Sequence, residues 1–283
     1  MSEGATESMV QYPDTGNKAL DTAISVSRVH SRAGLAFVAH PDSVPYALSW
    51  EDLLSVWRRS SPDGMGVYTP GNDSQGKWNQ VIAAYGRPVW GYVEDDYHPD
   101  TLSSWKLGRT WMAVPGSTGE WWGNIKERLR GGNSYCYWTP WRGWPGGSPP
   151  VMHVSVTMSG SQPVVSASFD QFVDRIEFIG WNYGRFGVLR SSTNLTGDSY
   201  TANGSEKFVR VLARKDFLGG SLYMASQPVM ITRYGYISGY GPNAVGNAIA
   251  ATSPELIIRY LEQEELPAPP PTGYVGSGYD VST

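Results

Sequence analysis

The first half of the chain alternates between short apolar runs and segments in which apolar residues recur at helical spacing. The apolar runs predict buried strands at 35–39, 65–69, 88–93 and 110–114. The helical spacing predicts helices at 17–32, from Ser49 onward, at 74–85 and at 118–130. This alternation with short connections favours βαβ units around a parallel sheet. Only four strands are visible, whereas a closed parallel barrel needs about eight.

Residues at the expected helix ends support this pattern. Ser49 followed by Asp52 at the third helical position predicts a capping box. Gly34 follows the first helix, and a glycine commonly ends a helix because it tolerates the left-handed conformation.

The pattern changes after residue 137. Residues 138–150 combine three tryptophans with glycine and proline and predict a linker. Short alternating runs, among them 164–169 and 175–181, then recur about every 10 residues, which is typical of an antiparallel β-sandwich. Ser253, Pro254 and Glu255 predict the start of a C-terminal helix that runs to Glu265 and is followed by an extended Pro/Gly-rich tail.

The expected fold is therefore α/β followed by all-β. The regions are an N-terminal arm (1–16), an α/β domain (17–137), a linker (138–150), a β-sandwich domain (151–235), and a C-terminal helix with its tail (236–283).

Composition narrows the classes of partner. The 283 residues carry a net charge of −4 without a basic cluster, which argues against nucleic acid and anionic membranes as partners. The single cysteine, Cys136, excludes an internal disulfide and a multi-cysteine metal site. The polar start and the lack of an apolar run of about 18 residues predict neither a signal peptide nor a membrane span. We expect a soluble protein, and the sequence leaves its compartment unknown.

Candidate metal ligands follow two of the predicted strands. Asp96 and His98 are two residues apart, so in extended backbone their side chains leave on the same face. His40 follows another strand, and neighbouring parallel strands would bring all three side chains to one rim. Two imidazoles and a carboxylate suit zinc, manganese or iron. Alternatively, each of the three is a loop residue whose side chain is hydrogen-bonded to the backbone. We expect His30 to be solvated or to cap its helix, and His153 to be structural.

The order of these motifs resembles a known family. Ala39-His40-Pro41, then Val67-Tyr68, then the segment 90–98 are similar to the second half of the PHP (polymerase and histidinol phosphatase) superfamily of metal-dependent phosphoesterases. Downstream, the segments 175–180, 208–211 and 226–229 resemble the carbaryl-hydrolase-like (CehA/McbA) branch, in which a β-domain follows the barrel.

The resemblance implies a partial PHP-type (β/α) barrel half in which His40, Asp96 and His98 are ligands of a divalent metal, zinc, manganese or iron. The sequence also departs from the family. Members begin with a His-x-His strand and carry further ligands before the His-Pro motif, and this chain has no His-x-His. Relatives often carry Glu where this chain has Gly66. A site that has lost most of its ligands usually loses metal affinity, so the active site is expected to be degenerate, and no residue is assigned a catalytic role.

Three explanations account for the missing barrel half. The chain is the downstream part of a longer protein, a second polypeptide supplies the other half, or the fragment is a scaffold whose open edge is covered by partner chains. The third predicts a structural or interaction subunit of a larger assembly, such as a phage tail or virion, formed with other subunits or as a homo-oligomer. The first two leave open an active metal-dependent phosphoesterase.

A third class of function is a carbohydrate-binding β-module. Trp138, Trp141 and Trp144, together with Trp181, would be the stacking platforms for a glycan. The alternative for these tryptophans is packing between the two domains.

Overall fold

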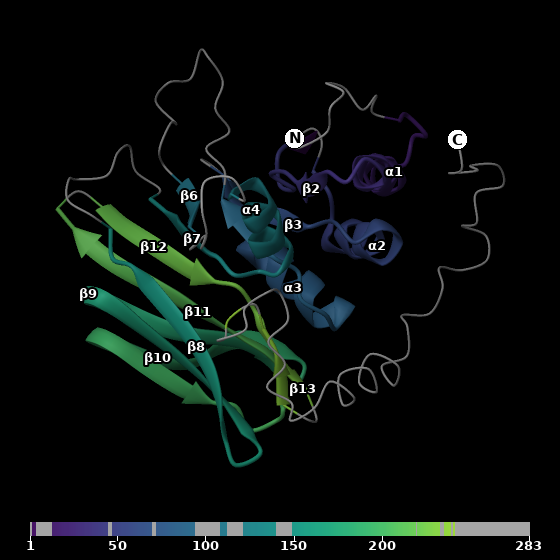
Figure 1. Cartoon of the computed structure of the whole chain (residues 1–283). Helices are drawn as coiled ribbons and strands as arrows, with labels where there is room; N and C mark the ends of the chain where they lie inside the picture. The colour runs from purple at the N-terminus through teal and green to yellow at the C-terminus, as the bar shows by residue number, and fades with distance from the viewer. Residues whose placement is uncertain are drawn as a thin grey trace.

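The computed structural model describes residues 2–3, 13–44, 47–69, 72–93, 108–111, 121–139, 149–218, 220–232, 235–238 and 240. A region of helices and short strands lies beside a broad sheet of long strands (Figure 1). The predicted N-terminal arm lies largely outside the described residues, and the predicted C-terminal helix and tail lie wholly outside them.

The described helices begin within about three residues of the predicted positions. They are α1 (Lys18–Ser31), α2 (Trp50–Ser60), α3 (Gln75–Tyr85) and α4 (Trp121–Arg130). The capping box at the start of α2 is confirmed, because Ser49 and Asp52 bond reciprocally to each other's backbone N–H. At the end of α1 the left-handed residue is Ala33, with a φ of 56°, and the Gly34 N–H donates to the Val29 carbonyl.

A small sheet contains the parallel strands. Its members are β1 (Ser2–Glu3), β2 (Leu35–Val38), β3 (Gly64–Thr69), β4 (Asn72–Asp73) and β5 (Gly91–Val93). The β2–β3 and β3–β5 pairs are parallel, which confirms that part of the sequence prediction. The two short strands, β1 and β4, pair antiparallel with β2 and β3.

The strand expected at 110–114 does not extend this parallel set. It is β6 (Gly108–Trp111), which pairs antiparallel with β7 (Tyr135–Trp138), and β7 pairs in turn with β12 (Gly220–Ser226). An apolar run predicts a strand without predicting its neighbours, which explains the error. Two strands from the predicted α/β domain, β6 and β7, therefore belong to the large sheet and not to the small parallel one.

The large sheet is antiparallel throughout its described pairs. Besides β6, β7 and β12 it contains β8 (Met152–Ser159), β9 (Gln162–Asn182), β10 (Arg185–Thr201), β11 (Glu206–Phe217), β13 (Val229–Thr232) and β14 (Gly235–Ile237). Two predicted runs, 164–169 and 175–181, merge into the single long strand β9. The first part of β9 pairs with β8 and the second with β11, while β10 pairs with both parts.

The β9–β10 hairpin bends sharply at its middle. Pairing jumps from Val173 opposite Leu195 to Ser168 opposite Gly197. Arg190 and Asp198 would lie about 26 Å apart on a straight strand, yet their side chains form an ion pair with a distance of 2.8 Å between Arg190 Nε and Asp198 Oδ2. The bulges at this bend let one sheet fold back into two layers that face each other. The sandwich-like arrangement is thus present, and it is built from one bent sheet.

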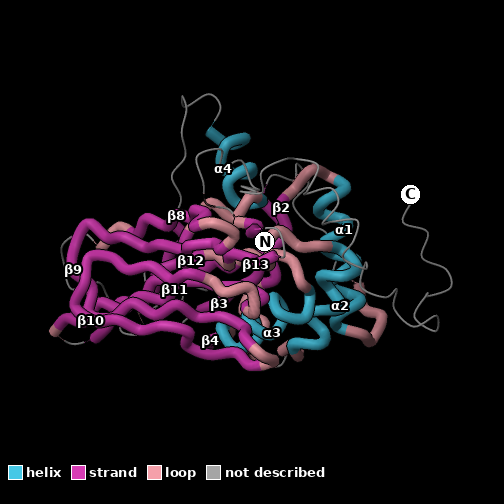
Figure 2. Tube along the Cα trace, turned by 90° about the horizontal axis from the view of Figure 1, so that it is seen from below, coloured by secondary structure: helices cyan, strands magenta, loops and turns pink. Residues whose placement is uncertain are grey.

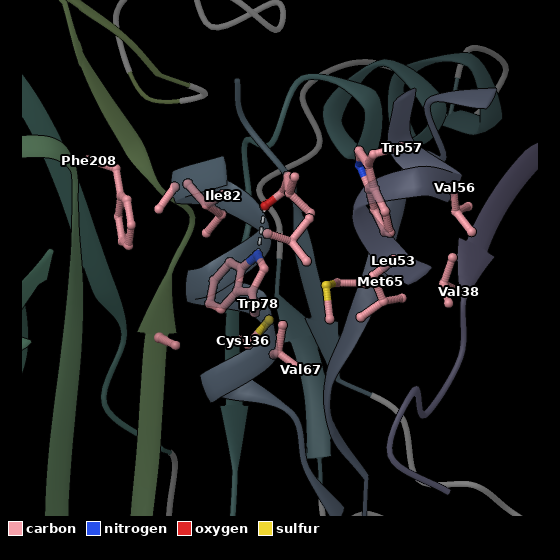
Figure 3. Packing of buried hydrophobic residues seen from close by; sticks show 14 of the residues in the cluster. Val38, Leu53, Val56, Trp57, Met65, Val67, Trp78, Ile82, Cys136 and Phe208 are labelled. Carbon is pink, nitrogen blue, oxygen red and sulfur yellow. Dashed lines mark hydrogen bonds between the residues drawn. The ribbon is translucent and has the colours of Figure 1, made fainter. Parts of the chain in front are cut away.

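Around β7, β11 and β12, both faces of the large sheet are packed. The enclosed face forms one core, in which Val165 from the first part of β9 and Phe178 from the second belong to the same cluster. On the other face, Cys136 and Phe208 pack with Trp78 and Val67 of the α/β region (Figure 3). The two regions therefore share a hydrophobic core. Figure 2 shows the helices on one side of the molecule and the β9–β10 hairpin extending away from them.

Candidate functional site

The carboxyl ends of β2, β3 and β5 form one rim of the small sheet, because these strands are parallel. His40 lies at this rim, two residues after β2, with a φ of 26°. Asp96 and His98 lie outside the described residues, so their predicted meeting with His40 stays a prediction. Among the residues that the structure does describe, no three His, Cys, Asp or Glu side chains form a group that could hold a metal ion.

The loop after His40 is fixed to the start of α3. Asp42 accepts a hydrogen bond from Ser74 Oγ and forms an ion pair with Lys77. Lys77 Nζ also donates to the Leu48 carbonyl over 2.6 Å. The negative charge of Asp42 is therefore neutralised by a lysine, and this part of the rim is a closed polar network.

The opposite end of the small sheet is held together by Asp63. Its carboxylate accepts from His30 Nε2 (2.9 Å), from the Ala36 N–H (2.7 Å) and from Arg130 Nε (3.2 Å). Burial alone would raise the pKa of Asp63, but these hydrogen bonds and the charge of Arg130 lower it below its ordinary value. The expectation that His30 is solvated or caps its helix is corrected, because it links α1 to the residue before β3. His153 is exposed on β8.

The edge of β5 is covered by the chain itself. The Gly91 N–H donates to Gln227 Oε1 over 2.7 Å, and Gln227 Nε2 donates to the Gly91 carbonyl over 2.7 Å. The Gln227 amide thus makes both bonds that a neighbouring strand would make. The Cys136 thiol also points to this carbonyl, with a sulfur–oxygen distance of 3.4 Å. At Gly91, therefore, the edge of β5 does not need a partner chain to satisfy its backbone hydrogen bonds.

Of the four predicted stacking tryptophans, Trp138 is buried and Trp181 is partly buried against the shared core. Trp138 is 2% exposed and stacks against Tyr68, with ring centroids 5.4 Å apart, and against Tyr223 at 5.7 Å. Its proposed role as a sugar platform is corrected to packing between the two regions, because protein rings occupy the space beside it. Trp141 and Trp144 lie outside the described residues.

Five of the seven large apolar side chains that are exposed among the described residues lie on the β9–β10 hairpin. They are Phe172 (64% exposed), Tyr183 (82%), Phe186 (45%), Val188 (53%) and Leu195 (37%). Elsewhere in the described part of the chain, only Val44 and Leu218 are large, apolar and exposed. Period-two patterning predicts such strands, but it does not show which face remains uncovered, so this surface was missed.

Comparisons with known proteins add no relative. Family models, curated proteins and solved structures were searched, and none matches this chain. None of the helices in the described segments has the length and apolar character needed to cross a bilayer.

Proposed function

We propose that this chain is a structural or interaction subunit of a larger protein assembly, and that the β9–β10 hairpin is its contact surface. The observation that carries the proposal is the concentration of exposed apolar side chains on this hairpin, three of them at 183–188. Aromatic residues are enriched in the buried centres of protein interfaces, and clustered apolar exposure marks interaction sites.

The form of β10 indicates how a partner binds. Within the described residues, β10 pairs only with β9, so its outer edge has no neighbouring strand. The pairing is interrupted between Val188 and Arg190 and again between Leu195 and Gly197. Such bulges hinder continuous addition of another strand. The contact therefore rests on apolar side chains, with Phe186 and Val188 at its centre.

The scaffold of this subunit is proposed to descend from a PHP-type phosphoesterase. Its support is the motif order in the sequence together with the parallel β2–β3–β5 arrangement. The engagement of Asp42 by Lys77 and Ser74 favours a rim that has become structural.

Self-association tests the interaction role. We expect the purified chain to show a mass above the 31.0 kDa of one chain in light scattering at micromolar concentration. Phe186→Glu should weaken the association by about 30-fold or more, because a charge would replace an aromatic side chain in a desolvated contact.

Leu218→Glu is the matched control, since Leu218 is 102% exposed and lies in the turn between β11 and β12, beyond the end of β11 that is farther from Phe186. It should leave the mass unchanged. A chain that remains a monomer at every concentration, or an equal effect of both substitutions, would contradict the proposed contact surface.

A second candidate function is metal-dependent phosphoesterase activity. It is favoured by the position of His40 at the carboxyl end of a parallel strand, where α/β folds commonly bind ligands. It predicts at least one zinc, manganese or iron ion per chain and loss of this metal in His40→Ala. His153→Ala should retain the metal, because His153 is exposed on β8. If the chain is instead an interaction subunit, we expect less than one metal ion per chain. Neither substitution should then change the metal content.

A further inference from the structure

Arg210 is a buried guanidinium whose partners are all uncharged. It lies on β11, is 1% exposed, and contacts one face of α3. Its Nε donates to Asn79 Oδ1 over 2.9 Å, and its Nη2 donates to Gln75 Oε1 over 3.2 Å. Its Cζ lies 4.8 Å from the centroid of the Trp78 ring. These contacts orient the guanidinium without neutralising it.

The positive charge has no ion-pair partner among the described residues. The carboxylates of Asp73 and Glu177 attract it, but neither forms an ion pair with it. A carboxylate is connected to Arg210 only indirectly: Gln75, which accepts from Arg210 Nη2, donates through its Nε2 to Asp73 Oδ2 over 3.2 Å. Burial lowers the pKa of Arg210 to about 10, so the side chain stays protonated at neutral pH. A buried charge without a counter-charge is strongly unfavourable.

Two buried donors beside this charge lack a hydrogen-bond partner. They are Arg210 Nη1 and Asn79 Nδ2, which belong to two side chains that are bonded to each other. Gln75, the residue bonded to Nη2, is the first residue of the 11-residue helix α3. At this N-terminus the backbone N–H of Gln75 already donates to Asp73 Oδ1 over 3.0 Å, so the charge that remains to be neutralised is that of the Arg210 guanidinium. Positive charge and unused donors at one place favour a negatively charged ligand.

We propose that Arg210 and the first turns of α3 bind one small inorganic anion of the size of chloride, between α3 and the large sheet. The anion would accept a hydrogen bond from Nη1 and neutralise the guanidinium. A small ion is favoured because Nη1 and Asn79 Nδ2 are both buried, which excludes a nucleotide or a sugar phosphate. The proposed site lies between α3 and β11, and it does not depend on the proposed assembly.

Thermal unfolding of the full chain at constant ionic strength tests this site, with sodium gluconate replaced stepwise by sodium chloride. Gluconate is too large for the site. The Tm should rise by about 3 to 5 °C once chloride reaches roughly ten times its Kd. Crystals soaked in bromide should show anomalous density within hydrogen-bond distance of Arg210 Nη1.

Asn79→Asp is the decisive variant, because it places a carboxylate oxygen where Asn79 Oδ1 now accepts from Arg210 Nε. The substitution is nearly isosteric and supplies the missing counter-charge. It should abolish the chloride-dependent rise in Tm. Gln80→Glu makes the same charge change on an exposed position of α3 and should keep the full chloride response.

Three results would each overturn the proposal. They are equal Tm values in chloride and gluconate, a chloride response that survives in Asn79→Asp, and bromide-soaked crystals without a peak at Arg210. Because Asn79→Asp retains Arg210 and its contact with Trp78, the test does not depend on a variant that lacks the arginine.

Discussion

Gln227→Leu should lower the free energy of unfolding by about 3 kcal/mol or more. The Gln227 side chain is fully buried and bonds the Gly91 N–H, the Gly91 carbonyl and Ser134 Oγ. Leucine has a similar volume but neither donates nor accepts, so the buried N–H and C=O of Gly91 would lose their partners. Each unsatisfied buried group costs about 1 to 3 kcal/mol.

Chemical denaturation measures this change, and hydrogen exchange of the Gly91 amide locates it. The amide should be protected in the wild type and should exchange faster in the variant. Gln162→Leu is the control, because Gln162 is exposed at the turn between β8 and β9. It should change the free energy of unfolding by less than about 0.5 kcal/mol. A similarly small effect of Gln227→Leu would show that the amide does not hold the two sheets together.

Trp78→Ala should have a comparable or larger effect, a loss of about 3 to 5 kcal/mol. The ring is 0% exposed and lies in the shared core beside Val67, Cys136 and Ile82 (Figure 3). Its Nε1 donates to the Val89 carbonyl over 2.7 Å. Alanine would leave a cavity between the two regions and an unpaired carbonyl.

The loss is measured by chemical denaturation monitored by circular dichroism. Trp78→Phe is an intermediate change, since it keeps one aromatic ring in the core and removes the Nε1 donor with the second ring, and it should cost less. Tyr183→Ala removes an aromatic ring that is 82% exposed and should change stability little. If Trp78→Ala and Tyr183→Ala had equal effects on stability, the shared core would not include Trp78.

Local signals account for what the sequence predicted correctly. Ser49 and Asp52 predict the start of α2 because the capping box involves only neighbouring residues. The parallel β2–β3–β5 arrangement also follows from short connections through helices. Asp96 and His98 stay predicted metal ligands, together with His40, because two of the three lie outside the described residues.

Long-range contacts account for what the sequence did not predict. The sequence pattern separates the runs 164–169 and 175–181, but pairing before and after this interval keeps Asp170 and Gln171 within β9 at its bend. Alternation on β11 places Arg210 on the same face as Phe208, but it does not show what covers that face. In the structure α3 covers it, so the arginine is buried. Nothing in the local pattern indicates that a second element covers this face.

The bond between Gly91 and Gln227 joins residues that are 136 positions apart in the chain, and this separation bears on the order of folding. The α/β region is synthesised first, whereas the strands that cover β5 and Trp78 come last. Contacts of such long sequence separation form slowly, because a large loop must close before they contribute. Until β12 and β13 have joined the sheet, the emerging chain exposes the apolar face around Trp78. The nascent protein therefore passes through a period in which it is most exposed to aggregation, and this period ends only when its last described strands are in place.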